Sequence, residues 1–350
     1  MTQVLAIDVG AGTQDILLYD SEKTLENCVK LVLPSRTTQL ARRVAQATGA
    51  GQDVFLVGNL MGGGPLASAV KKHARAGYGV YATAEAAKSL RDDPREVEAL
   101  GVKIVAAPPA GAVTLTTGDV DLASLRAALA RFDVVLPERY AVAVQDHGEC
   151  IGISQRRFRF QHWEAFVRGG GLLPSLAFPS ELPDYLTRMR AVRRDAPGAL
   201  IMDTCAAAVL GALDDEKVAA HRDEGLVIVN VGNQHTLGVL CQGDRILGLF
   251  EHHTVLMTEE KLARYVRALQ LGTIDNEQIY EDNGHGAIVH PDYSEVKDFS
   301  AQAFEFVAVT GPNRRLAKSL SYHFATPHGD MMLSGCFGLI MAARWAGWID

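Results

Sequence analysis

The chain has 350 residues, 48% of them hydrophobic and 21% charged, so it can bury a large core and is too long for one small domain. Its 34 basic and 41 acidic side chains give a net charge of −7, which disfavours nucleic acid as the main partner. The five cysteines are dispersed, which fits a reducing, cytoplasmic setting. No leader pattern or bilayer-length apolar run is evident, so we expect neither export nor membrane insertion.

The first predicted element is a hairpin with a glycine-rich tip. Val4 to Val9 is predicted as a buried strand and Asp15 to Tyr19 as its returning partner, and the sequence IDVGAGTQD places Asp8 at the end of the first strand. Glycines let backbone N–H groups converge on a phosphate, and a divalent cation would relieve the repulsion between that phosphate and Asp8. We therefore expect Asp8 to face a metal. The residues expected to face the phosphates are Gly10, Gly12, Thr13 and Gln14.

Between residues 52 and 213 the chain alternates strand-like and helical patterns, which predicts an α/β architecture. Strands are predicted at 52–60, 102–106, 142–145 and 199–203, and helices at 66–75, 121–132 and 205–213. Gly62 to Gly64 forms either a structural turn or a second anion site at a helix N-terminus. Arginines alternate with phenylalanines over residues 154–163, which favours a strand with one basic and one aromatic face.

Asp146 and His147 follow the predicted strand at 142–145. A carboxylate or imidazole there could take a proton from an acceptor hydroxyl, so both are candidate catalytic residues. The alternative is that they form only a polar turn.

The second half of the chain repeats the residue pattern of the first hairpin. Residues 226–244 form an apolar strand, a polar tip and a second apolar strand, and Asn230 takes the place of Asp8. The tip residues of this second candidate phosphate loop are Gly232, Asn233, Gln234, His235 and Thr236. A helix is predicted at 259–269 with Thr258 as its N-cap, followed by an open loop at 275–292, a strand at 304–310 and a final helix at 332–346.

The chain has 11 histidines, including His252 and His253 after Glu251, and His285 and His290 in the predicted open loop. None of their spacings matches a helical metal-binding pair. The sequence therefore does not predict a transition-metal site, and it leaves open whether these residues converge in space.

Five segments, in order, resemble the motifs of the actin-like ATPase superfamily, which includes actin, the sugar kinases and the heat-shock chaperones. DVGAGTQD resembles the first phosphate loop and NVGNQHT the second. MDTCAAAVLGAL, with Asp203 near the metal's water shell, and GDMMLSGCFGLIMAARW resemble the two connecting helices. VAVTGPNRRLAKSL resembles the adenosine-binding strand and turn, which includes Gly311.

This resemblance implies a duplicated ribonuclease-H-like fold with two subdomains around a nucleotide cleft. These would be residues 1–212 and residues 213–334, with the C-terminal helix at 335–350 packing back onto the first. The implied cofactors are ATP or ADP with Mg²⁺, with Asp8 and Asp203 as metal residues. Asn230 removes a charge that the family usually has, and Pro312 replaces a glycine of the adenosine turn. Slow hydrolysis is therefore expected, and the base preference stays open.

The chain is also similar to a group of bacterial and archaeal proteins, some of them labelled pyruvate formate-lyase activating proteins. A radical activase needs a clustered CxxxCxxC, which this sequence does not contain. We therefore expect a slow ATPase that activates or reactivates a partner enzyme through cleft closure. The alternatives are a kinase acting on a small hydroxylated metabolite and a non-catalytic nucleotide-sensing scaffold.

Overall fold

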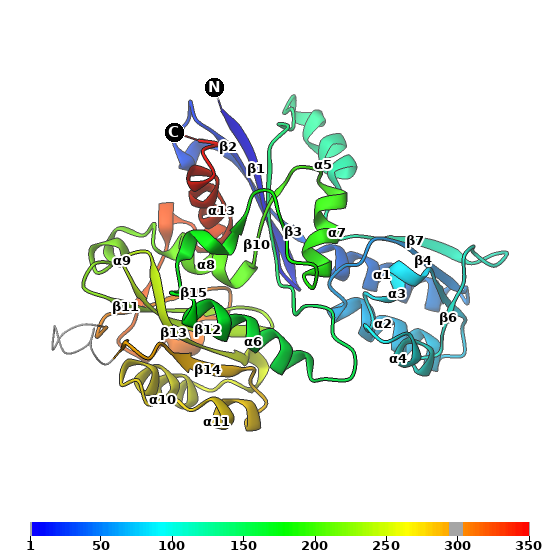
Figure 1. Cartoon of the computed structure of the whole chain (residues 1–350). Coiled ribbons are helices and arrows are strands. Elements are labelled where there is room, and N and C mark those ends of the chain that lie inside the picture. Colours follow the sequence, from blue (N-terminus) through cyan, green and yellow to red (C-terminus); the bar gives the residue numbers. More distant parts are fainter. Residues whose placement is uncertain (1, 294–303, 350) are drawn as a thin grey trace.

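The computed structural model describes residues 2–293 and 304–349. These residues form three lobes, two built on six-stranded sheets and one on a four-stranded sheet (Figure 1). The first sheet has the order β3-β2-β1-β8-β10-β9. Its strands are β1 (Gln3–Val9), β2 (Thr13–Asp20), β3 (Val29–Pro34), β8 (Tyr140–Val144), β9 (Ala177–Phe178) and β10 (Leu200–Met202). Strands β1 to β3 form an antiparallel meander, while β8 runs parallel to both β1 and β10.

The second sheet has the order β14-β13-β12-β11-β15-β16 and repeats this arrangement. Its strands are β11 (Leu226–Val231), β12 (His235–Gln242), β13 (Arg245–His253), β14 (Gly286–Val289), β15 (Val307–Thr310) and β16 (His323–Phe324). Again the first strand of an antiparallel meander, β11, lies in the interior of the sheet and pairs in parallel with a later strand, β15. This duplicated topology confirms the predicted ribonuclease-H-like, actin-like fold.

The third lobe is inserted into the first half of the chain, between β3 and β8 (blue to cyan in Figure 1). Its parallel sheet has the order β6-β5-β4-β7 and its own apolar core. Its elements are α1 (Arg36–Gly49), β4 (Val54–Gly58), α2 (Gly64–Arg75), β5 (Val80–Ala82), α3 (Ala84–Ala87), α4 (Pro94–Ala99), β6 (Val102–Ile104) and β7 (Val113–Thr117). The sequence analysis did not separate this lobe from the first subdomain.

The remaining helices cover the two large sheets. They are α5 (Leu122–Leu129), α6 (Gln155–Arg168), α7 (Thr187–Asp195), α8 (Thr204–Ala212), α9 (Glu216–Ala220), α10 (Glu259–Gln270), α11 (Asn276–Glu281) and α13 (Ser334–Trp345). The predicted cap of α10 is confirmed, because the Thr258 side chain accepts a hydrogen bond from the backbone N–H of Lys261.

Two element predictions were wrong. Residues 154–163, predicted as a strand, lie largely in α6, because Phe160, Trp163 and Val167 bury one helical face whose spacing outweighs the short arginine–phenylalanine alternation. The predicted open loop at 275–292 contains α11 and β14. Strand β14 forms only through its pairing with β13, a contact that local sequence does not reveal.

One segment of the first 212 residues lies on the second sheet. Helix α6 packs on β13 and β14 of the second sheet, although it belongs to the first 212 residues (Figure 1). After it, the backbone N–H of Ile246 donates a hydrogen bond to the carbonyl of Gly171 at 2.8 Å. The chain therefore crosses to the second sheet and then returns to the first through α7.

Helices α8 and α13 cross between the two sheets. Every residue of α8 from Cys205 to Ala212 is buried, and α13 lies against β1, β2 and β8. A Cβ at Gly211 would overlap the carbonyl oxygen of Ser334, and one at Gly338 would overlap that of Ala207. The two helices thus touch backbone to backbone, within a core cluster that both sheets share.

We expect Gly338→Ala to destabilise the protein by about 1–3 kcal/mol, because the backbone of Ala207 cannot rotate away from the added methyl group. The matched control is Gly49→Ala at the end of α1, where an added Cβ meets no atom within 4 Å. That change should be neutral or stabilise by up to about 1 kcal/mol. Thermal unfolding of both variants tests the close contact between the two helices. Equal shifts in melting temperature would contradict that contact.

Candidate functional site

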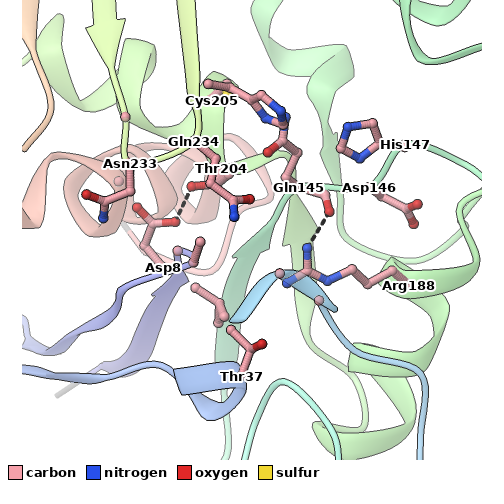
Figure 2. A pocket seen from close by; sticks show the side chains of 18 of the residues that line it. Asp8, Thr37, Gln145, Asp146, His147, Arg188, Thr204, Cys205, Asn233 and Gln234 are labelled. Carbon is pink, nitrogen blue, oxygen red and sulfur yellow. Dashed lines mark hydrogen bonds between the residues drawn. The ribbon is translucent and has the colours of Figure 1, made fainter. Parts of the chain in front are cut away.

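A cavity of about 330 Å³ lies between the two hairpin tips (Figure 2). Its wall includes both tips, the first residues of α8 and α13, the end of β8 and the loop from Leu60 to Gly64. The cavity is therefore bounded by all three lobes of the molecule.

The two tips adopt the same turn. The backbone N–H of Gly10 donates to the carbonyl of Thr13 at 2.8 Å, and that of Gly232 donates to the carbonyl of His235 at 2.9 Å. Each strand pair therefore ends in an equivalent turn, and His235 takes the structural position of Thr13. A Cβ at Gly12 would lie 3.1 Å from the Asn233 amide nitrogen, so the tips also approach each other closely.

Most of the predicted loop residues line this cavity. Those that do are Gly10, Thr13, Asn230, Gly232, Asn233, Gln234, His235 and Gly311. Gln14 and Thr236 are exceptions, because each follows the tip on the opposite face of its strand. The Gln14 amide donates to the Pro34 carbonyl, and the Thr236 hydroxyl bonds that of Thr254. Gly12 packs on Asn233 and does not line the cavity wall.

Asp8 and Asp15 form a pair of carboxylates at one end of the cavity. They are register partners across the hairpin and so lie on the same face of it. Asp8 accepts a hydrogen bond from the Thr204 hydroxyl at 2.6 Å (Figure 2), while Asp15 is only 7% exposed and its Oδ1 has no hydrogen-bond partner. Within the described residues, neither carboxylate forms a salt bridge.

Burial raises the pKa of Asp8 to about 7, and burial together with the charge of Asp8 raises that of Asp15 to about 8. The pair therefore lacks a compensating positive charge. Sequence reasoning named Asp8 and missed Asp15, although the register of a tight hairpin places these two residues opposite each other.

The structure gives Asp203 two other partners. Its Oδ1 accepts a hydrogen bond from the backbone N–H of Cys205, which caps α8, and its Oδ2 pairs with the Arg159 guanidinium at 2.9 Å. Asp203 does not line the cavity, although it lies close enough to raise the pKa of Asp8. Its contribution to the cavity is therefore to fix Thr204, the next residue.

Asp146 is held in a similar way. Its Oδ1 accepts from the backbone N–H of Gly148 at 2.8 Å and its Oδ2 from that of Met189 at 2.9 Å. Burial raises the pKa of this carboxyl. These contacts agree with the polar-turn alternative, in which Asp146 anchors the chain that presents His147 to the cavity (Figure 2).

A buried charge network centres on Arg159 of α6 and Glu251 of β13. The guanidinium Nε donates to both oxygens of Glu251, at 3.0 and 2.8 Å, while Nη1 donates to Asp203. Glu251 also accepts from the side chains of Gln145 and Trp163. Burial opposes ionisation of Glu251, but Arg159 holds the pKa of that carboxyl well below its usual range. The network joins the first half of the chain to the second. Sequence reasoning missed it, because residues 154–163 were predicted as a strand and not as the helix that carries Arg159.

The loop from Leu60 to Gly64 lines the cavity, but its Gly62 N–H already has a hydrogen-bond partner within the protein. The Gly62 N–H donates to Asp119 at 3.2 Å, and Arg188 binds the same carboxylate through two nitrogens, at 2.7 and 2.9 Å. Arg188 also donates to the Gln145 carbonyl (Figure 2). A Cβ at Gly62 would collide with the Arg188 guanidinium, so close packing explains this glycine.

The predicted nucleoside turn has a left-handed backbone conformation that favours its glycine. Gly311 has φ of +95°, and a Cβ there would approach the Val231 carbonyl and the Asn230 side chain. The turn therefore packs directly behind the second tip.

Three histidines meet beside the second tip. His147 follows β8, His235 begins β12 and His285 precedes β14, and one ring nitrogen from each lies within 4.8 Å of the others. Burial lowers the pKa of His235 to about 3 and that of His285 to about 4, so both rings are neutral at physiological pH. Sequence spacing gave no signal for this group, because its members come from three separate elements.

The model of one protein family, described as "Putative pyruvate format-lyase activating enzyme (DUF1786)", matches residues 61–316. The chain belongs to this family. The family match includes the second hairpin and the three histidines, and it begins after the first hairpin. No curated protein matches the chain.

Several solved structures are similar to the whole chain. The inorganic polyphosphate/ATP-glucomannokinase from Arthrobacter sp. strain KM has 11% identity and a TM-score of 0.36, covering 99% of this chain and 100% of that one. The ethanolamine utilization protein EutJ from Carboxydothermus hydrogenoformans has 11% identity and a TM-score of 0.36, with coverages of 96% and 88%. The ROK hexokinase from Thermus thermophilus has 12% identity and a TM-score of 0.34, with both coverages at 99%. At these identities and TM-scores, the similarity supports no conclusion about activity or substrate.

Among the helices of residues 2–293 and 304–349, none combines the length and the apolar character needed to cross a membrane.

Asp8→Asn removes a carboxylate whose pKa rises from 3.8 to about 7 on folding. Because the folded state holds this proton more tightly, the carboxylate lowers stability as pH rises from about 4 to about 7, and the full cost remains above that. In cation-free buffer we expect the variant to be more stable than the wild type at pH about 8, on the order of 2 kcal/mol. This advantage should shrink toward pH about 5.

Thermal unfolding of both proteins in EDTA across this pH range measures the effect. The buried histidines are present in both proteins, so their contribution cancels when the stability of the wild type is subtracted from that of the variant. Their lowered pKa values act on stability in the opposite direction below pH about 6.5. The control is Glu224→Gln, at an exposed carboxylate, which should show no such trend. A pH-independent difference for Asp8→Asn would refute the raised pKa.

Proposed function

We propose that the protein binds a nucleotide, with ATP or ADP as the first candidates, together with Mg²⁺ in the cavity between the hairpin tips. The observation that carries this proposal is the pair of uncompensated carboxylates, Asp8 and Asp15, beside two equivalent glycine turns. Carboxylate oxygens are ligands that Mg²⁺ prefers, and turn amides without a nearby Cβ suit phosphate oxygens.

In this proposal Asp8 and Asp15 hold the hydrated ion, which neutralises phosphate charge when it is bound. The tips that contain Gly10 and Gly232 receive the phosphates, and the turn at Gly311 lies on the nucleoside side. Thr204 orients Asp8 through its 2.6 Å hydrogen bond, and Asp203 fixes Thr204 by capping α8. Asp203 is thus a positioning residue in this arrangement.

We further propose that hydrolysis is slow and coupled to cleft closure that acts on a partner enzyme. Asn230 supports the slow rate, because the second tip lacks the charge that the first tip has in Asp8. The contact between tips and lobes supports the coupling, since a Cβ at Gly64 of the third lobe would lie 3.1 Å from the Gln234 amide. The family's description supports an activating role.

A second candidate is a kinase for a small hydroxylated metabolite. The cavity continues past the tips to the Gly62 loop and Arg188, which leaves a place for an acceptor next to the proposed phosphate site. Since both oxygens of Asp146 accept backbone hydrogen bonds, His147 is the better candidate base.

Asp8→Asn should abolish Mg²⁺-dependent nucleotide binding, because it removes an ion ligand while keeping the size of the side chain. The measurement is thermal unfolding with ATP, ADP or GTP, with and without Mg²⁺. A ligand at about 100 times its dissociation constant adds about 2.7 kcal/mol to the native state. We expect this stabilisation in the wild type and in the control Glu224→Gln, and its loss in Asp8→Asn. An unchanged response in Asp8→Asn would refute the site.

Asn230→Asp should tighten Mg²⁺ binding by about tenfold or more and speed hydrolysis, because it places a negative charge on the cavity wall. Mg²⁺ titrations monitored by nucleotide affinity and by phosphate release measure both effects. A loss of both would show that the neutral amide is itself required.

Steady-state turnover separates the two candidate functions. ATP consumption that rises only with a hydroxylated acceptor favours the kinase, and slow turnover raised by a protein partner favours the activator. Nucleotide binding without turnover would point to the sensing scaffold.

A further inference from the structure

Four histidine rings gather behind the second hairpin tip. The rings of His235 and His285 are 4.8 Å apart between centroids, and His147 lies 5.4 and 5.5 Å from them. His253 packs against His235 and His285 at 5.1 and 4.9 Å. Ring nitrogens from His147, His235 and His285 converge within 4.8 Å, so modest side-chain rotations would bring all three to one ion.

Three ring nitrogens in this group are buried without a hydrogen-bond partner. They are Nδ1 of His235 and both nitrogens of His285, whose side chains belong to residues 8% and 1% exposed. Burying a polar atom without a partner is unfavourable. A neutral imidazole has one lone-pair nitrogen and one N–H, so His235 and His285 can each offer one nitrogen to a ligand that accepts a lone pair.

The surroundings also suit a cation. Glu251 is fully buried, and its Oε1 lies 3.9 Å from Nδ1 of His235. Arg159 pairs with both Glu251 and Asp203, and Arg156 also lies close enough to act on His285, so these fixed charges nearly balance. Carboxylates placed behind histidine ligands fix ring orientation and increase ligand basicity.

The group is open on one side. His147 and His235 line the central cavity, whereas His285 lies behind them and is almost fully buried. Three protein ligands with a remaining position toward a cavity is the arrangement of catalytic rather than structural zinc sites. We propose that His147, His235 and His285 bind a first-row transition ion such as Zn²⁺, with its open coordination position facing the cavity.

The position of this ion defines the chemistry of what it would bind. His235 sits in the turn of the second tip, where its carbonyl accepts from Gly232. An oxygen donor of a second substrate, a hydroxyl or a carboxylate, would fill the open position next to the phosphates. Binding of the ion would also occupy His147, which removes it as a general base. The site is independent of Asp8 and Asp15, so it stands or falls separately from the proposed nucleotide site.

The experiment is metal binding by the full chain after removal of metals with a chelator. Zn²⁺ titration by calorimetry should give one site per chain, and Co²⁺ should give the visible absorption of a low-symmetry site with nitrogen ligands. His285→Gln should weaken Zn²⁺ binding tenfold or more, and His235→Gln should do the same. The matched control is His221→Gln, directly after α9, which should bind like the wild type.

Two further measurements keep the test decisive. Should His285→Gln fail to fold, His147→Gln replaces it, because His147 lies at the cavity edge and its loss leaves less buried volume to refill. Asp8→Asn should keep Zn²⁺ binding, and His285→Gln should keep the Mg²⁺-nucleotide response. No Zn²⁺ or Co²⁺ binding by the folded wild type, or equal affinity in the histidine variants, would overturn the site.

Discussion

The crossing of α8 and α13 is the constraint on which the cavity depends. Because Gly211 and Gly338 let the two helices touch at the backbone, their N-termini reach the end of β1 together. Thr204 at the start of α8 bonds Asp8, and Gly335 in the first turn of α13 packs against the same carboxylate. A wider crossing would separate the two sheets and move both helix ends away from Asp8.

The molecule contains two groups of buried carboxylates, and they differ in whether a basic side chain pairs with them. Arg159 pairs with Glu251 and Asp203 within the protein, so that network holds α6 to β13 through internal partners. Asp8 and Asp15 have no such internal cation among the described residues. The first arrangement has its counter-charge inside the fold, whereas the second leaves an energetic cost that an external cation can offset.

The two halves of the fold are similar in topology and different in chemistry. At equivalent positions the first hairpin has Asp8 and Thr13, and the second has Asn230 and His235. One side of the cavity therefore offers carboxylate oxygens and the other imidazole nitrogens, which suit hard and borderline cations respectively. The two turns share one backbone geometry, and the residues at a few positions give them different candidate ligating groups.

The sequence by itself determined the features that depend on near neighbours along the chain. Both glycine hairpins, the Thr258 cap and the apolar connecting helices follow from local pattern and turn chemistry, and their order predicted the fold. Only the tertiary structure decided which distant side chains meet. The helical face of α6 that carries Arg159 and the strand that follows His285 are fixed by long-range packing on β13. Strand pairing and burial depend on partners far along the chain, so no local pattern could place these groups at the cavity.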